Sequence, residues 1–163
     1  MKRFERKQIA GFTLLEVLIA LLVLSIGMLG VAGMQISSLK ASQNTFYRSQ
    51  GNMLAYEMMD RISVNAASVA SYGGVNTTSN NYSSTNCETS ACVAAAIAAF
   101  DIAQWEINLA SALPSGNGSI AVAAGLVTVT VRWDEFHNGG TSCAVGEPDP
   151  ATDLICITES FRP

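Results

Sequence analysis

The longest pattern in the chain is an uninterrupted apolar run that follows a short basic segment. Residues 1–11 contain four basic residues and one acidic residue, and the 23 residues from Val17 to Leu39 contain no charged residue. About 20 predominantly apolar residues span a bilayer as a helix, so the length is typical of a transmembrane segment. A secretory signal peptide would have a shorter core, about 7–15 residues, followed by its cleavage site. The basic residues favour a cytoplasmic N-terminus, which places the chain after Lys40 beyond the inner membrane.

Helical spacing continues beyond the apolar run. Tyr47, Leu54, Met58 and Ile62 recur at offsets that place them on one face of a helix. The pattern therefore predicts a single helix over residues 12–68, roughly 85 Å long at about 1.5 Å per residue. We expect its second half to pack on a globular head.

A second helix is predicted over residues 91–113, after a segment rich in Ser, Asn, Thr and Gly over residues 71–90. Ser90 is the expected N-cap, and Pro114 the expected stop. The predicted buried stripe is Ala98, Ile102, Trp105, Leu109 and Leu113, and the predicted solvent-facing stripe is Asp101, Gln104, Asn108 and Ser111.

The last third of the chain alternates apolar and polar residues with a period of two, which predicts strands. Ile120 and Val122 precede Ala124-Gly125, a predicted hairpin turn, and a further strand is expected over 154–159. The middle strand buries Val127, Val129, Val131 and Trp133 and exposes Thr128, Thr130, Arg132 and Asp134. The expected fold class is α+β, with a long N-terminal helix packed on a small head that contains a second helix and an antiparallel sheet.

One acidic residue, Glu16, lies at the start of the apolar segment. A charge within a membrane costs roughly 2.5–3.5 kcal/mol on insertion scales, and such residues usually have a partner. The nearest candidate is the α-amino group that cleavage before Phe12 would create, because residues four apart share one face of a helix. An ordinary single-pass anchor would leave Glu16 unexplained.

The residues around Glu16 resemble a known signal. Gly11-Phe12-Thr13-Leu14-Leu15-Glu16, followed by Val17-Leu18-Ile19-Ala20-Leu21, is similar to the class III signal of type IV prepilins and pseudopilins. In that family a membrane prepilin peptidase cuts after the glycine and methylates the new terminal amine. The resemblance implies cleavage between Gly11 and Phe12, N-methylation of Phe12, and an assembly role for the Glu16 carboxylate. It also implies a type IV pilin-like fold.

This interpretation divides the chain into four parts: a leader peptide (1–11), a transmembrane and filament helix (12–39), the periplasmic half of the long helix (40–70), and a globular head with disulfides (71–163). Cleavage would remove four basic residues and one acidic residue, so the net charge of −4 becomes −7. Proteins that track phosphates need clustered Lys and Arg, so no direct nucleic-acid contact is expected.

Four cysteines, Cys87, Cys92, Cys143 and Cys156, follow the apolar segment, which suits disulfides in an oxidising periplasm. Three pairings are possible, and sequence proximity favours Cys87–Cys92 and Cys143–Cys156. A Cys₄ zinc site usually needs two closely spaced pairs, and the spacing from Cys143 to Cys156 gives no second close pair, so zinc is not expected.

The sequence offers little support for catalysis or cofactor binding. The one histidine, His137, lies in an expected loop, and no nucleophile elbow or P-loop is present. Glu147, Asp149 and Asp153 could supply oxygens to calcium, but their spacing is not that of an EF-hand. A solvated acidic turn is the preferred interpretation, and no enzyme activity or cofactor is expected.

Several head segments resemble one subgroup, the minor pilins called type IV pilus modification protein PilV. They are Ala55 to Ile62, Asp101 to Trp105 with Leu109, Leu113 and Pro114, Gly116 to Gly118, and Val129 to Trp133. This resemblance implies a minor pilin that helps to initiate and assemble the pilus, which serves twitching motility, adhesion or DNA uptake. Its expected partners are prepilin peptidase, other minor pilins, the major pilin, the inner-membrane assembly platform and membrane lipid. A type II secretion pseudopilin and a pilus-tip adhesin are the alternatives.

Overall fold

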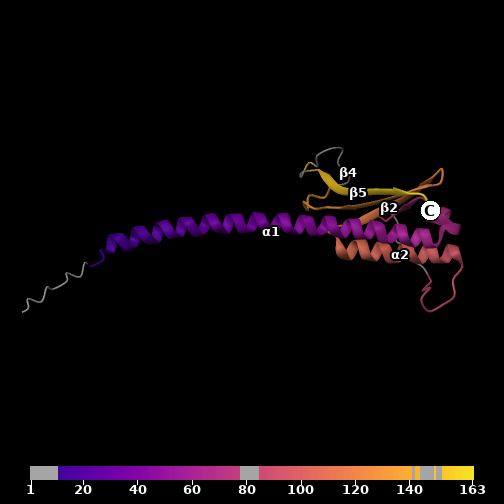
Figure 1. The fold of residues 1–163 in the computed structure, drawn as a ribbon, viewed down its shortest axis with the longest axis horizontal. Coiled ribbons are helices and arrows are strands. Elements are labelled where there is room, and N and C mark those ends of the chain that lie inside the picture. Colours follow the sequence, from indigo (N-terminus) through magenta and orange to yellow (C-terminus); the bar gives the residue numbers. More distant parts are fainter. Residues whose placement is uncertain (1–10, 78–84, 141, 144–148, 150–151) are drawn as a thin grey trace, which may run out of the picture. The chain divides into compact units, whose positions relative to one another are not determined.

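The computed structural model describes residues 11–77, 85–140, 142–143, 149 and 152–163 of the 163-residue chain. The chain divides into two compact units, residues 1–42 and residues 43–163. The helices and strands, labelled in Figure 1, are α1 (Leu14–Val64), the 3₁₀ helix η1 (Ala66–Tyr72), β1 (Val75–Asn76), α2 (Ala94–Ala112), β2 (Asn117–Ala123), β3 (Leu126–Trp133), β4 (Ser142–Cys143) and β5 (Asp153–Phe161). The α+β class, with a long apolar N-terminal helix, a second helix and a mostly antiparallel sheet, is confirmed.

The long helix α1 is continuous from Leu14 to Val64, close to the predicted 12–68. In the second unit its buried residues are Gly51, Leu54, Ala55, Met58 and Ile62, so the predicted apolar face is confirmed there. The chain then continues as the 3₁₀ helix η1, so the α-helix ends at Val64, before the predicted residue 68.

Helix α2 begins later than predicted, and the Ser90 N-cap is wrong. Val93 holds the cap position with no side-chain cap bond, and its carbonyl oxygen accepts from Ala96 N–H at 2.8 Å and Ile97 N–H at 3.0 Å. The helix thus starts only after Cys92, whose disulfide fixes the preceding backbone. The predicted buried stripe is confirmed, and the extended Leu113 before Pro114 ends the helix as expected. One member of the predicted solvent stripe, Asp101, is instead buried.

The sheet has the order β1-β2-β3-β5-β4. Strands β2 and β3 form the predicted hairpin around Ala124-Gly125, whose φ values of 50° and 73° match a two-residue type I′ turn. Strand β5 pairs antiparallel with β3, and the four inward residues of β3 are fully buried. Asp134, expected to face solvent, is buried just beyond the strand. The short strands β1 and β4 were not predicted, because two-residue strands have no periodicity to recognise.

Both helices of the second unit cover the same face of the sheet. In Figure 1, α2 runs beside the end of α1, and the strands lie against the helices. A Cβ placed on Gly51 of α1 would meet Trp133 and Ile157, and one placed on Gly118 of β2 would meet Trp105 of α2. The core of this unit therefore lies between one sheet face and two helices.

Candidate functional site

The N-terminus of α1 is closed by Thr13. The Thr13 hydroxyl accepts from Glu16 N–H at 3.3 Å, and its carbonyl oxygen accepts from Glu16 N–H at 3.1 Å and Val17 N–H at 3.3 Å. A hydroxyl in this position satisfies one of the backbone donors that a helix N-terminus leaves free. The helix consequently begins at Leu14, two residues after Phe12.

Phe12 precedes the Thr13 cap and lies outside the helix, whereas Glu16 lies in its first turn, four residues later. The Phe12 side chain is 82% exposed, and Glu16 is an exposed acid in the first turn. A carboxylate is favoured there because the helix dipole is positive at its N-terminus. If the chain were cut before Phe12, its new amine would lie four residues before this carboxylate and just ahead of the helix. Gly11 is within the described part of the chain, whereas the basic residues of the expected leader lie outside it.

The first part of α1 presents an apolar surface with no cover from its own chain. Every residue from Val17 to Leu39 is exposed, including the large aliphatic ones. By length and composition, α1 is the one helix in the described residues that could cross a membrane, and its most apolar window is entirely unburied. Apolar surface of this extent needs lipid or other helices to cover it.

In the second unit a partly buried polar network joins α1, η1 and α2. Arg61 donates to Glu57 at 2.7 Å and to Asp101 at 3.1 Å, and the Tyr72 hydroxyl donates to Asp101 at 2.6 Å. Asn65 donates to the Tyr72 oxygen at 3.1 Å and to the Ala94 carbonyl at 2.8 Å. Asp101 was predicted to face solvent because it is charged; it is buried because it accepts from both Arg61 and Tyr72.

This network shifts the pKa values of two of its members. Burial raises the pKa of Tyr72 above its usual range, and its hydrogen bond to Asp101 raises it further. Burial alone would lower the pKa of Arg61, but the bonds to Glu57 and Asp101 outweigh burial and raise it. The network therefore holds Tyr72 neutral and Arg61 charged.

Two tryptophans fix the packing of the same unit. Trp105, expected to be a core residue, is fully buried and donates from Nε1 to the Leu54 carbonyl at 3.0 Å. A Cβ on Gly118 would lie 2.3 Å from the Trp105 ring, and one on Gly51 would lie 2.8 Å from the Trp133 ring. Glycine is required at both positions because each backbone lies directly against an indole.

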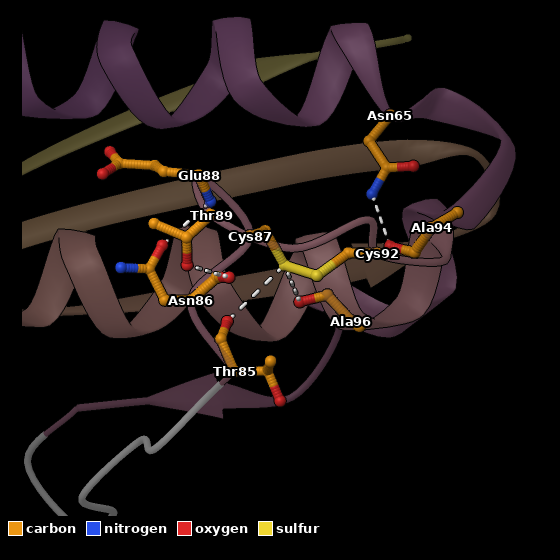
Figure 2. Close-up of a disulfide and its surroundings, with 9 residues drawn as sticks. All are labelled: Asn65, Thr85, Asn86, Cys87, Glu88, Thr89, Cys92, Ala94 and Ala96. Carbon is orange, nitrogen blue, oxygen red and sulfur yellow. Dashed lines mark hydrogen bonds between the residues drawn. A yellow bond between two sulfur atoms is a disulfide. The ribbon is translucent and has the colours of Figure 1, made fainter.

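Two disulfides link Cys87 to Cys92 and Cys143 to Cys156, the pairing favoured by proximity. Figure 2 shows the first at the start of α2, where Cys87 Sγ lies 3.7 Å from the Ala96 carbonyl oxygen. A disulfide sulfur has no proton to donate, so this is a contact and not a hydrogen bond. The second disulfide joins β4 to β5.

His137 lies in an exposed turn that Asp134 organises. The Asp134 carboxylate accepts from Asn138 N–H at 3.1 Å and from Gly139 N–H at 2.9 Å. Burial acts to raise the pKa of Asp134, but the backbone donors of this turn outweigh burial and lower it. His137 adopts a φ of 55° within this turn, as a loop residue would.

The acidic segment considered for calcium is only partly described. Glu147 and its neighbouring prolines lie outside the described residues. The Asp153 carboxylate accepts from Asp149 N–H at 3.0 Å, so it stabilises its own local backbone. Within the described ranges, no three His, Cys, Asp or Glu residues form a group that could hold a metal ion.

Comparison with known proteins gives two family matches that together span more than half of the chain. The prokaryotic N-terminal methylation motif matches residues 6–32, and the family described as Type IV pilin Tt1218 (Tt1218-like) matches residues 33–103.

The chain belongs to the type IV pilin family. This family is structural and not enzymatic, and the methylation motif implies processing of this pilin by prepilin peptidase. Its apolar N-terminal helix is consistent with anchoring in the inner membrane before pilus assembly. No curated protein and no solved structure matches this pilin.

The two matched segments of the pilin correspond to two structural features. The methylation motif spans the start of α1, and the Tt1218-like match extends through the polar network to Asp101 and ends at residue 103. Sequence reasoning missed the Thr13 cap, although Thr-x-x-Glu before an apolar run is a known capping pattern. It also missed the Arg61–Asp101 pair, whose 40-residue separation leaves no local pattern.

Proposed function

We propose that the chain is a minor pilin of the type IV pilus, of the PilV type, that takes part in initiating and assembling the filament. Prepilin peptidase cuts between Gly11 and Phe12 and methylates the Phe12 amine. The observation that carries this proposal is Glu16, an exposed acid in the first turn of an unburied apolar helix, four residues after Phe12.

The electrostatics of this turn support an assembly role. A lone carboxylate at membrane depth costs roughly 2.5–3.5 kcal/mol on insertion scales, so it gains from a cationic partner. The Phe12 amine can supply that partner within one subunit. The same amine on a subunit already in the filament can pair with the Glu16 carboxylate of an incoming subunit, so a charge at membrane depth acts as an assembly signal.

The proposed arrangement has the leader (1–11) in the cytoplasm, a membrane and filament helix (12–39), and the rest of α1 (40–70) with the head (71–163) in the periplasm. Two disulfides within the head support an oxidising compartment. The processed subunit would join other minor pilins and the major pilin at the inner-membrane assembly platform. Motility, adhesion or DNA uptake would follow from the filament.

The carboxylate is tested with Glu16→Ala and Glu16→Gln in cells that assemble pili. Both variants should still be processed, as followed by electrophoretic mobility, while their amount in sheared pili falls by about tenfold, since the amine loses its partner. Ser25→Ala is the matched control, because the Ser25 hydroxyl already donates to Leu21 of its own helix at 2.7 Å. Incorporation of the Glu16 variants at wild-type levels would contradict the role of the carboxylate.

The assignment to the pilus is tested by counting surface pili with electron microscopy in a clean deletion strain and its complemented control. Loss of pili that return on complementation supports the proposal. Normal pili with lost protein secretion would favour a type II secretion pseudopilin. Normal pili with lost attachment would favour a tip adhesin.

A further inference from the structure

The end of α1 and the start of α2 enclose a groove of about 340 Å³ on the surface of the second unit. Two aliphatic side chains form its rim, Val64 at 91% exposure and Ile97 at 36%. The remaining lining residues are Asp60, Arg61, Asn65 and Asp101.

The floor of the groove has its polar groups satisfied. Arg61 is held by Glu57 and Asp101, and Asn65 donates to Tyr72 and Ala94, as described above. Asp60 differs from these residues, because its exposed carboxylate has no hydrogen bond or ion pair within the described part of the chain. One carboxylate at the rim is therefore open to a partner.

The charges at the groove are unbalanced. Asp60 and Asp101 line it together with one cation, Arg61, whose guanidinium is already bound by Asp101 and by Glu57 beside the groove. Tyr56 and Met53, earlier on α1, are also exposed apolar side chains. A complementary surface would carry a cation beside apolar side chains, since opposite potentials favour a specific encounter.

We propose that this groove docks a segment of a different pilus subunit, in which a Lys or Arg lies beside an aliphatic side chain. The cation pairs with Asp60, and the aliphatic group packs between Val64 and Ile97. A second copy of this chain is the poorer fit, because its net charge of −4, or −7 once processed, opposes an acidic groove. This inference rests on the proposed function and names a partner for it.

The test places a photo-crosslinking amino acid at Ile97 in the full-length chain, in cells that assemble pili. Control positions are Met28, in the apolar part of α1, and Thr158, exposed on β5. The expected product from Ile97 joins another pilin at a segment that contains Lys or Arg, with no such product from Thr158. Asp60→Lys should lower its yield by about tenfold through like-charge repulsion, whereas Glu88→Lys, an exposed acid outside the groove, should not. Reversing the partner's cation should restore the yield with Asp60→Lys.

Other outcomes overturn the docking proposal. They are a product between two copies of this chain, an unchanged yield with Asp60→Lys, or no rescue by the reversed partner. If Met28 crosslinks to pilins and Ile97 does not, the docking proposal for the groove is wrong while the proposed function stands. If neither position crosslinks to any pilin, the proposed function fails with it.

Discussion

Replacing Asp101 with alanine should be among the most destabilising single changes in the second unit. Its side chain is 11% exposed and accepts two hydrogen bonds, one from Arg61 and one from Tyr72. Alanine removes both acceptor oxygens, so the buried Tyr72 hydroxyl is left as a hydrogen-bond donor without an acceptor. The free energy of unfolding should fall because buried donors without acceptors are costly.

The size of the effect follows from the two contacts. Hydrogen bonds to charged groups contribute about 1.5–3 kcal/mol each. Arg61 is partly exposed and keeps its bond to Glu57, so its share lies at or below the lower end of that range. The Tyr72 bond is buried at 2.6 Å, and its share lies at the upper end. Together they predict a loss of about 3–4 kcal/mol, a large part of the roughly 5–15 kcal/mol that stabilises a typical domain.

The measurement is urea unfolding of the full chain in detergent micelles, followed by tryptophan fluorescence, because Trp105 and Trp133 are both fully buried. Tyr72→Phe should cost about 1–2 kcal/mol, and combining it with Asp101→Ala should cost less than the sum of the two. Ser111→Ala, at an exposed position of α2, should change stability by less than about 0.5 kcal/mol. An Asp101→Ala loss as small as that of Ser111→Ala, or strict additivity with Tyr72→Phe, would refute the network.

Three further predictions concern packing, covalent links and acid. Gly118→Ala should lower the free energy of unfolding by about 1–3 kcal/mol, because its Cβ meets the Trp105 ring; the same urea titration measures it. Replacing Cys143 and Cys156 by serine should cost about 3 kcal/mol on the chain-entropy model, seen as a lower Tm by calorimetry. Folding lowers the pKa of Asp134, so its ionised carboxylate stabilises the turn above about pH 4, and this stabilisation is lost as the pH falls below that value. Amide hydrogen exchange in the turn should become faster at acid pH. Asp134→Asn should remove this pH dependence.

Periodic features of this fold were predictable from the sequence. The apolar face of α1, the buried stripe of α2 and the alternation in β3 repeat over several residues, and burial follows them. The hairpin was predictable because Ala124-Gly125 lies between two alternating runs. The two-residue strands β1 and β4 contain no repeat, and their positions depend on β2 and β5 as neighbours.

The errors occurred where a tertiary contact reverses a local preference. Ser90 has the chemistry of an N-cap, but α2 starts only after the disulfide-bonded Cys92. Asp101 is charged, which is typical of a surface residue, but it is buried because Arg61 and Tyr72 donate hydrogen bonds to its carboxylate. The start of α1 was predicted two residues too early, at residue 12, because the Thr13 cap was not recognised in the sequence.

The segment from Ala55 to Ile62 shows how one helix can serve both folding and recognition. Ala55, Met58 and Ile62 are buried in the core, so these side chains cannot distinguish one partner from another. Tyr56 and Asp60 of the same segment face outward. Replacing an inward residue should therefore lower stability and assembly together, whereas replacing Asp60 should lower assembly alone. Unfolding and incorporation measured on the same variants separate these two effects.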